Sequence, residues 1–80
     1  MEYIVGCITM FPYSFVPQDW LLCDGSTVAI STYQLLYSVI GTRYGGDGVS
    51  NFKLPDLSHA KPNDYIHYFI AYNGIYPEQN

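Results

Sequence analysis

The residues best suited to chemistry stand together in the segment from Arg43 to Gly48, R-Y-G-G-D-G. Three glycines leave backbone N–H groups open to a ligand, and successive N–H groups of this kind can bind an anion. Arg43 adds a planar fork of donors that suits an anionic group, and Tyr44 adds an aromatic face. The candidate ligand-binding residues are therefore Arg43, Tyr44, Gly45, Gly46 and Asp47. The ligand class that this combination suits is a glycan or a nucleotide.

The same segment also has a purely structural interpretation. Aspartate beside glycine is a common turn residue, so Asp47 would cap backbone groups, and Arg43 would pair with Asp47 or Asp56. The segment is not a P-loop, because no Lys-Ser/Thr follows the glycines and no strand is expected before them. The sequence leaves both interpretations open.

No other group of residues matches a catalytic or metal-binding pattern. Asp24, Asp47 and Asp56 each stand next to a glycine or a proline, where aspartate serves turns, and their spacing is not that of a calcium loop. His59 and His67 are too few and too far apart for a zinc site within one chain. We therefore predict no catalytic residue, no metal, no cofactor and no enzymatic activity.

The two cysteines, Cys7 and Cys23, both lie in apolar runs. Small buried side chains explain them, and a chain without a secretion signal favours reduced thiols over a disulfide. Apolar neighbours should raise the pKa of Cys23, which argues against a reactive thiolate. No serine or cysteine stands in a recognised nucleophile motif.

Length and charge restrict the remaining functions. Eighty residues make one domain, residues 1–80, and oligomerisation commonly supports the small core of such a domain. The net charge is −4 with only three Lys and Arg residues, too few for the phosphates of polymeric nucleic acid. No apolar run reaches the roughly 20 residues of a membrane-spanning helix. The first residues lack the basic region of a signal peptide, so we expect neither membrane insertion nor signal-directed secretion.

Hydrophobic patterns predict a small α+β module. Alternating residues predict strands at 3–11, 20–23 and 64–73, and Asp24-Gly25 is a turn signal after the second of them. A long glycine-rich loop lies between this turn and the final strand, which closes the fold.

One segment, residues 31–40, has helical periodicity. Ser31 and Gln34 have the spacing of a capping box, and Gly41 is suited to end the helix. Tyr33, Leu36, Tyr37 and Ile40 share one face. Ten residues is short for an autonomous helix, so packing must stabilise it.

The final strand, residues 64–73, carries large side chains on both of its faces. A strand of this kind needs cover on both sides, and we expect a second subunit to supply part of that cover. The chain also has nine tyrosines, more large amphipathic rings than a small interior needs. Tyr68 and Tyr72 lie on one face of this strand and are the candidate oligomer contacts.

The order of short motifs resembles the phage tail collar domain family. The residues that carry the resemblance are Gly6, Ile8, Phe11, Pro17, Trp20, Cys23-Asp24-Gly25, Tyr33, Leu36, Ile40-Gly41-Thr42, Tyr44-Gly45-Gly46-Asp47-Gly48, Phe52 and Leu54-Pro55-Asp56-Leu57. The tail, Gly74-Ile75-Tyr76-Pro77, is similar to the ending of the microcystin-dependent branch of that family. The resemblance implies a structural and interaction module of a tail fibre, assembled as a homotrimer, with surface adhesion as a possible role. It also implies a place in the virion or in the cytoplasm of a phage-infected host bacterium.

The chain departs from the family pattern in two places. Ser58-His59-Ala60-Lys61 stands where typical members carry an arginine-rich segment and a long variable region, in which receptor specificity would be expected. Asp19 replaces the glycine that precedes Trp20, which puts a positive φ at that position in doubt. An alternative function follows from the first departure, namely a free oligomer that holds a glycan or a nucleotide between subunits and acts by adsorption or sequestration.

Overall fold

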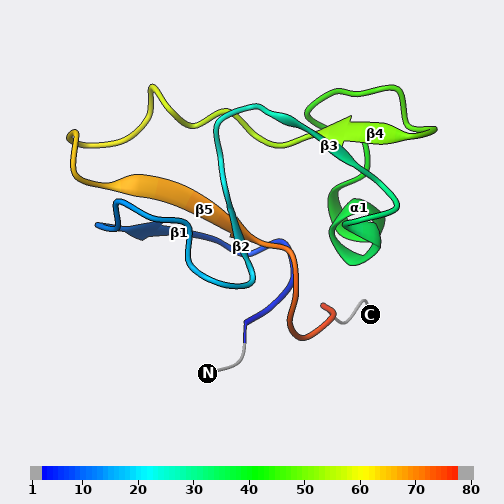
Figure 1. Cartoon of the computed structure of the whole chain (residues 1–80), viewed down its shortest axis with the longest axis horizontal. Coiled ribbons are helices and arrows are strands. Elements are labelled where there is room, and N and C mark those ends of the chain that lie inside the picture. Colours follow the sequence, from blue (N-terminus) through cyan, green and yellow to red (C-terminus); the bar gives the residue numbers. More distant parts are fainter. Residues whose placement is uncertain (1–2, 78–80) are drawn as a thin grey trace.

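A computed structural model describes residues 3–77 of the chain as two small antiparallel sheets and one short helix. The elements follow in the order β1 (Ile8–Phe11), β2 (Trp20–Leu22), β3 (Thr27–Ala29), α1 (Gln34–Ile40), β4 (Asn51–Lys53) and β5 (His67–Ala71). The three-stranded sheet has the order β1-β5-β2, and β3 pairs with β4. In Figure 1, α1 and the β3–β4 pair lie together at one end of the molecule. The predicted α+β class is confirmed.

The last strand, β5, is the centre of the larger sheet. Ile70 lies opposite Ile8 of β1 on one side and opposite Leu21 of β2 on the other. The chain therefore closes by inserting its final strand between its first two, as Figure 1 shows. The strand is shorter than the predicted range 64–73, because Asn63 accepts hydrogen bonds from the backbone N–H groups of Tyr65 and Ile66 and holds those residues in a turn.

The first strand is also shorter than predicted. Gly6 has a φ of +90°, and the N–H of Cys7 donates to the carbonyl of Ile4, so residues 4–7 form a turn before β1. A Cβ atom at Gly6 would lie 2.9 Å from Cγ1 of Val39. The glycine therefore permits both the turn and the close approach of α1.

The helix α1 begins later than predicted, and the capping box is not formed. Tyr33 is the N-cap residue, and no side chain caps it. The backbone N–H groups of Thr32 and Tyr33 both donate to the carbonyl of Ala29, so a turn out of β3 continues to Tyr33 and the helix begins only after it. The predicted end is confirmed, since Gly41 has a φ of +56° and its N–H donates to the carbonyl of Tyr37 over 2.7 Å.

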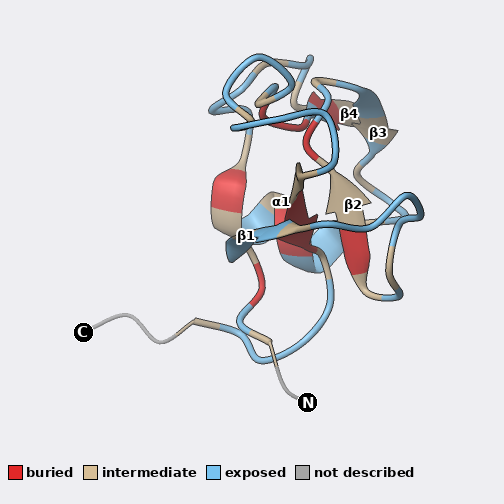
Figure 2. Ribbon diagram, turned by 90° about the vertical axis from the view of Figure 1, so that its left-hand side faces the viewer, coloured by how far each residue is buried: buried red, intermediate tan, exposed pale blue. Residues whose placement is uncertain are grey.

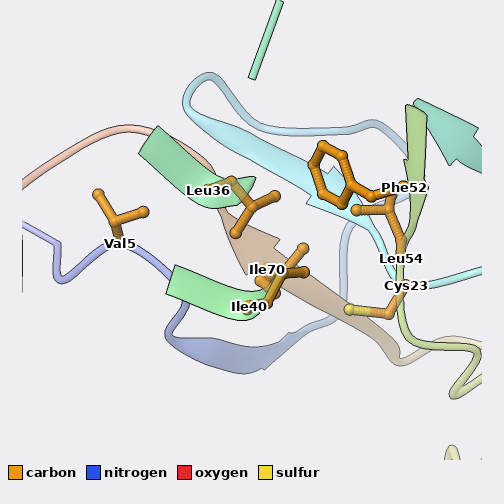
Figure 3. Packing of buried hydrophobic residues seen from close by; sticks show 7 residues of the cluster. All are labelled: Val5, Cys23, Leu36, Ile40, Phe52, Leu54 and Ile70. Carbon is orange, nitrogen blue, oxygen red and sulfur yellow. The ribbon is translucent and has the colours of Figure 1, made fainter. Parts of the chain in front are cut away.

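Two buried clusters cover the two faces of β5. The larger one lies between the sheet, α1 and β4, and Figure 3 shows its members, Val5, Cys23, Leu36, Ile40, Phe52, Leu54 and Ile70. The smaller one consists of Trp20, Phe69 and Ala71, with Tyr3, Phe11 and Leu22 packed against it. Tyr3 and residues of β1 and β2 therefore cover this second face from within the chain, and the part of the cover expected from a second subunit stays a prediction. Figure 2 shows the buried start of β2, the strand that begins with Trp20 of this cluster.

The cysteines differ in their surroundings. Both thiols are free, as predicted, and Cys23 is buried. Burial, assisted by the negative charge of Asp24, raises the pKa of the Cys23 thiol to about 12. Cys7 is exposed, contrary to the expectation from its apolar neighbours. It follows the turn at Gly6, and its Sγ lies 3.6 Å from Oγ1 of Thr9 on the outside of the fold.

Asp19 keeps the backbone conformation that a glycine would adopt. Its φ is +74°, in the left-handed region that few residues other than glycine enter. Its carbonyl accepts a hydrogen bond from the N–H of Tyr72, and its carboxylate accepts one from the side-chain amide of Asn73. These contacts with the end of β5 offset the cost of the conformation.

Candidate functional site

The glycine loop, residues 41–50, connects α1 to β4 and uses much of its own hydrogen-bonding capacity. The N–H of Gly45 donates to the carbonyl of Thr42 over 3.0 Å, and the carbonyl of Gly45 accepts from the N–H of Lys53 over 3.1 Å. The N–H of Gly48 donates to the carbonyl of Asn51 over 3.0 Å. Two of the glycine N–H groups that the sequence offered to an anion are therefore bonded within the chain.

The carboxylate of Asp47 organises the end of this loop. Its Oδ1 accepts hydrogen bonds from the backbone N–H groups of Val49, Ser50 and Asn51 at 2.9, 3.0 and 3.0 Å. Its Oδ2 accepts from the side chains of Ser50 and Asn51. The backbone N–H of Asp47 donates in return to Oδ1 of Asn51. These donors favour the ionised form and lower the pKa of Asp47 to about 2.

Gly46 lies directly against β4. Its φ is +99°, and a Cβ atom there would overlap the Cα atom of Phe52 and lie 3.0 Å from the carbonyl oxygen of Asn51. Phe52 is fully buried in the larger core cluster. The loop can pack on the core only because this residue has no side chain. Tyr37 adds a contact from α1, since its hydroxyl donates to the carbonyl of Gly48 over 3.3 Å.

Arg43 and Tyr44 are the two candidate residues whose side chains point to solvent. Both are exposed, and Tyr44 keeps 44% of its surface accessible. The predicted pairing of Arg43 is absent, because hydrogen bonds from their own loops hold the carboxylates of Asp47 and Asp56. The structure thus divides the candidate site into a bonded frame, made by Gly45, Gly46 and Asp47, and two side chains available to a ligand.

The other aspartates serve turns. Asp24 accepts a hydrogen bond from the N–H of Ser26, and Gly25 has the positive φ expected of the turn, +79°. Asp56 accepts from both the backbone N–H and the hydroxyl of Ser58, which lowers the pKa of its carboxyl. Asp24 and Asp56 pair as an isolated β-bridge, so the two turns lie side by side.

The two histidines lie in different surroundings. His67 is half-buried at the start of β5, 6.4 Å from the ring of Phe69, whereas His59 is exposed. Within residues 3–77, no group of three or more His, Cys, Asp or Glu side chains is placed to hold a metal ion. The same part of the chain contains no helix with the length and apolar character to cross a membrane.

Tyr68 and Tyr72 are half-buried and pack against the larger core cluster. Tyr72 makes an edge-to-face contact with Tyr33, with ring centres 5.0 Å apart. Tyr68 lies opposite Met10 of β1, and residues directly opposite one another share a face of the sheet. Ile8 shares this face too, and Ile8 and Met10 keep 38% and 49% of their surface accessible. We call Ile8, Met10 and Tyr68 the β1 face.

Sequence reasoning missed a row of stacked aromatic rings in the segment between β1 and β2. Phe15 stacks on Tyr13 and Tyr13 on Phe11, each at 5.0 Å with planes 9° apart. Phe11 then contacts the edge of the buried Trp20 at 5.1 Å. The row borders a hollow of about 150 Å³ that His67 and Leu22 also line. The alternation of aromatic residues at positions 11, 13 and 15 could have indicated this row, but the prolines at positions 12 and 17 favour a loop there.

Comparison with known proteins identifies the family. The family model of the phage tail collar domain matches residues 6–62, which is more than half of the chain. The chain therefore belongs to that family. Among curated proteins, it is similar to the short tail fiber protein gp12 of Enterobacteria phage T4, with 48% identity over 54 residues. The match covers 66% of this chain and 10% of the relative, so the chain corresponds to a small part of that fibre protein.

Proposed function

We propose that this chain is a structural and interaction module of a phage tail fibre that assembles into a symmetric homo-oligomer and acts without enzymatic activity. Family membership and the similarity to a short tail fiber protein support the fibre role. A trimer is the favoured state, as the collar resemblance implies. A place in the virion fits this role, and adhesion to a cell surface is its expected consequence.

One observation about the geometry supports assembly most directly. The chain covers both faces of β5, yet the β1 face leaves Ile8 and Met10 largely accessible at the edge of the sheet. The segment from Gly6 to Phe11 carries no charged residue, although the chain has a net charge of −4. A second copy can therefore approach this face without repulsion between like charges, and covering it removes apolar surface from water.

Size-exclusion chromatography with light scattering tests the proposal. The parent should assemble at micromolar concentration, and Met10→Asp should dissociate it, because a carboxylate would be placed in the contact. Val49→Asp is the matched control, since Val49 is 86% exposed in the glycine loop, outside the β1 face. A folded monomeric parent, or a Met10→Asp variant that assembles like the parent, would contradict the proposal.

A second candidate function is a small-ligand binder that uses Arg43 and Tyr44. The observation that favours it is the exposure of these two side chains on a loop whose remaining polar groups are bonded internally. A glycan or nucleotide held between subunits would contact both. A thermal-shift screen of sugars and nucleotides tests this candidate, because a ligand at 100 times its Kd adds about 2.7 kcal/mol of stability. Binding that survives loss of both side chains would exclude the assignment.

A further inference from the structure

The residue pair Asn73-Gly74 lies just beyond β5, after Tyr72, where three separate parts of the chain meet. The side-chain amide of Asn73 donates to the carboxylate of Asp19 over 3.2 Å. The next residue but one, Ile75, donates its N–H to the carbonyl of Tyr3 over 2.6 Å and accepts from the N–H of Val5 over 2.9 Å. Asn73 thus anchors the segment that ties the end of the described chain to its beginning.

The same pair has the geometry of an intramolecular reaction. The backbone N–H of Gly74 donates to Oδ1 of Asn73 itself at 3.0 Å, which places the Gly74 nitrogen close to the side-chain carbonyl carbon, Cγ. A nucleophile held close to its electrophile reacts faster, because the entropy cost of bringing the two groups together has already been met by the fold. Gly74 has no side chain to hinder the approach.

Solvent reaches both residues. Asn73 and Gly74 are exposed, and Asn73 borders a hollow of about 240 Å³ beside the start of α1. Water can therefore remove the proton from the Gly74 nitrogen and later hydrolyse the product. The other asparagines that the structure describes are different, because Asn51 precedes Phe52 and Asn63 precedes Asp64. Their larger following residues hinder the same attack.

We propose that Asn73 is a site of spontaneous covalent modification that releases the contact with Asp19. The Gly74 nitrogen, after losing its proton to solvent, attacks Cγ of Asn73 and forms a new C–N bond. The side-chain nitrogen, Nδ2, takes up a proton from solvent, and the Cγ–Nδ2 bond breaks to release ammonia. Water then opens the resulting five-membered imide to aspartate or isoaspartate. No electrons are exchanged, and water is the only co-reactant.

Deamidation of Asn73 would replace its hydrogen bond to Asp19 with electrostatic repulsion between two carboxylates. The product carboxylate has no N–H to donate to Asp19, and the two negative charges face each other where a hydrogen bond stood. The net charge changes from −4 to −5, since one neutral side chain becomes an anion. We expect the segment 73–77 to separate more often from residues 3–5, while β5 itself stays paired.

Peptide mapping by mass spectrometry tests the reaction. The folded protein is incubated in mildly alkaline buffer, and deamidation is followed at all asparagines, with Asn51 and Asn63 as internal controls. Conversion at Asn73 should be at least about tenfold faster than at either control, because glycine leaves the attacking nitrogen unhindered. It should also be at least as fast in the folded protein as in urea, because the fold positions that nitrogen. Conversion of Asn73 that is slower in the folded protein than in urea would overturn the proposal, since the fold would then protect the residue.

Hydrogen exchange tests the consequence separately. The N–H groups of Val5 and Ile75 should exchange faster in Asn73→Asp, which reproduces the product charge, than in the parent. Asn73→Gln keeps a neutral amide on a longer side chain, so it separates the effect of the new charge from the effect of replacing asparagine. Equal exchange in all three proteins would show that the modification does not release the segment. Neither readout depends on the oligomeric state, so failure here leaves the proposed assembly untouched.

Discussion

Two surface segments of this protein contrast in how they use their polar and apolar groups. The glycine loop, residues 41–50, has the densest motif in the sequence, and its hydrogen bonds turn inward to Asp47, Gly45 and β4. The segment between β1 and β2 has no such motif, yet its outermost ring, Phe15, is 62% exposed. The dense glycine motif marks a structural constraint, whereas the outer end of the aromatic row is open to solvent.

The largest effect should come from adding one methyl group to the glycine loop. In Gly46→Ala the new Cβ overlaps the backbone of Phe52, and the backbone cannot give way as a side chain can. We expect a loss on the order of 3 kcal/mol or more in the free energy of unfolding, measured by urea denaturation. Gly41→Ala is the control, because nothing lies within 4 Å of its Cβ and only its φ of +56° opposes the change. Its cost should be smaller, about 1–3 kcal/mol for a side chain in a sparsely populated backbone conformation; equal costs would contradict the packing role of Gly46.

The aromatic row should show a gradient of stability along its length. Phe11 contacts both Trp20 and Phe69 of the smaller cluster, so Phe11→Ala should cost roughly 2 kcal/mol or more. Phe15 ends the row in solvent, and Phe15→Ala should change stability by less than about 0.5 kcal/mol. Thermal and urea unfolding measure both variants. If Phe15→Ala were as costly as Phe11→Ala, the outer ring would be part of the core.

Acid should weaken the glycine loop before it affects the aromatic row. The pKa of Asp47 is about 2 in the folded chain, below its unfolded value of 3.8, so the ionised form stabilises the fold above pH 3.8. This contribution is lost as the pH falls through about 2. The stability of Asp47→Asn should therefore decline less than that of the parent between pH 3.8 and about 2. Urea midpoints at several pH values test this, and an unchanged pH profile in Asp47→Asn would contradict the role of its carboxylate.

The smallest effect on folding should come from Arg43→Ala. The guanidinium has no carboxylate partner among residues 3–77, because Asp47 and Asp56 are held by other donors, so stability should change by less than about 0.5 kcal/mol. Assembly should also be unchanged. A loss of several kcal/mol would restore the structural interpretation of this side chain, and a loss of glycan or nucleotide binding with normal melting would support the second candidate function.

The candidate site was only partly predictable from the residue types. Adjacent glycines and an aspartate indicate a tight loop, but they do not say whether the N–H groups face a ligand or the chain itself. That depends on Asn51 and Lys53, whose backbone groups come within hydrogen-bond distance only when β4 packs beside the loop. The capping box failed for a similar reason, since a turn out of β3 extends to Tyr33 and makes Tyr33, not Ser31, the N-cap residue.

The family, the α+β class, the end of α1 at Gly41 and the turn at Gly25 could all be predicted from the amino-acid sequence. The family follows from the order of short motifs along the chain, and the helix end and the turn follow from conformational preferences that act over a few positions. Tertiary structure alone decided that β5 enters between β1 and β2, that the aromatic row covers one of its faces, and that Asp19 holds a positive φ beside Asn73. These features join residues up to 62 positions apart, as in the pairing of Ile8 with Ile70. Their free energy comes from packing and hydrogen bonds that no local window of sequence contains.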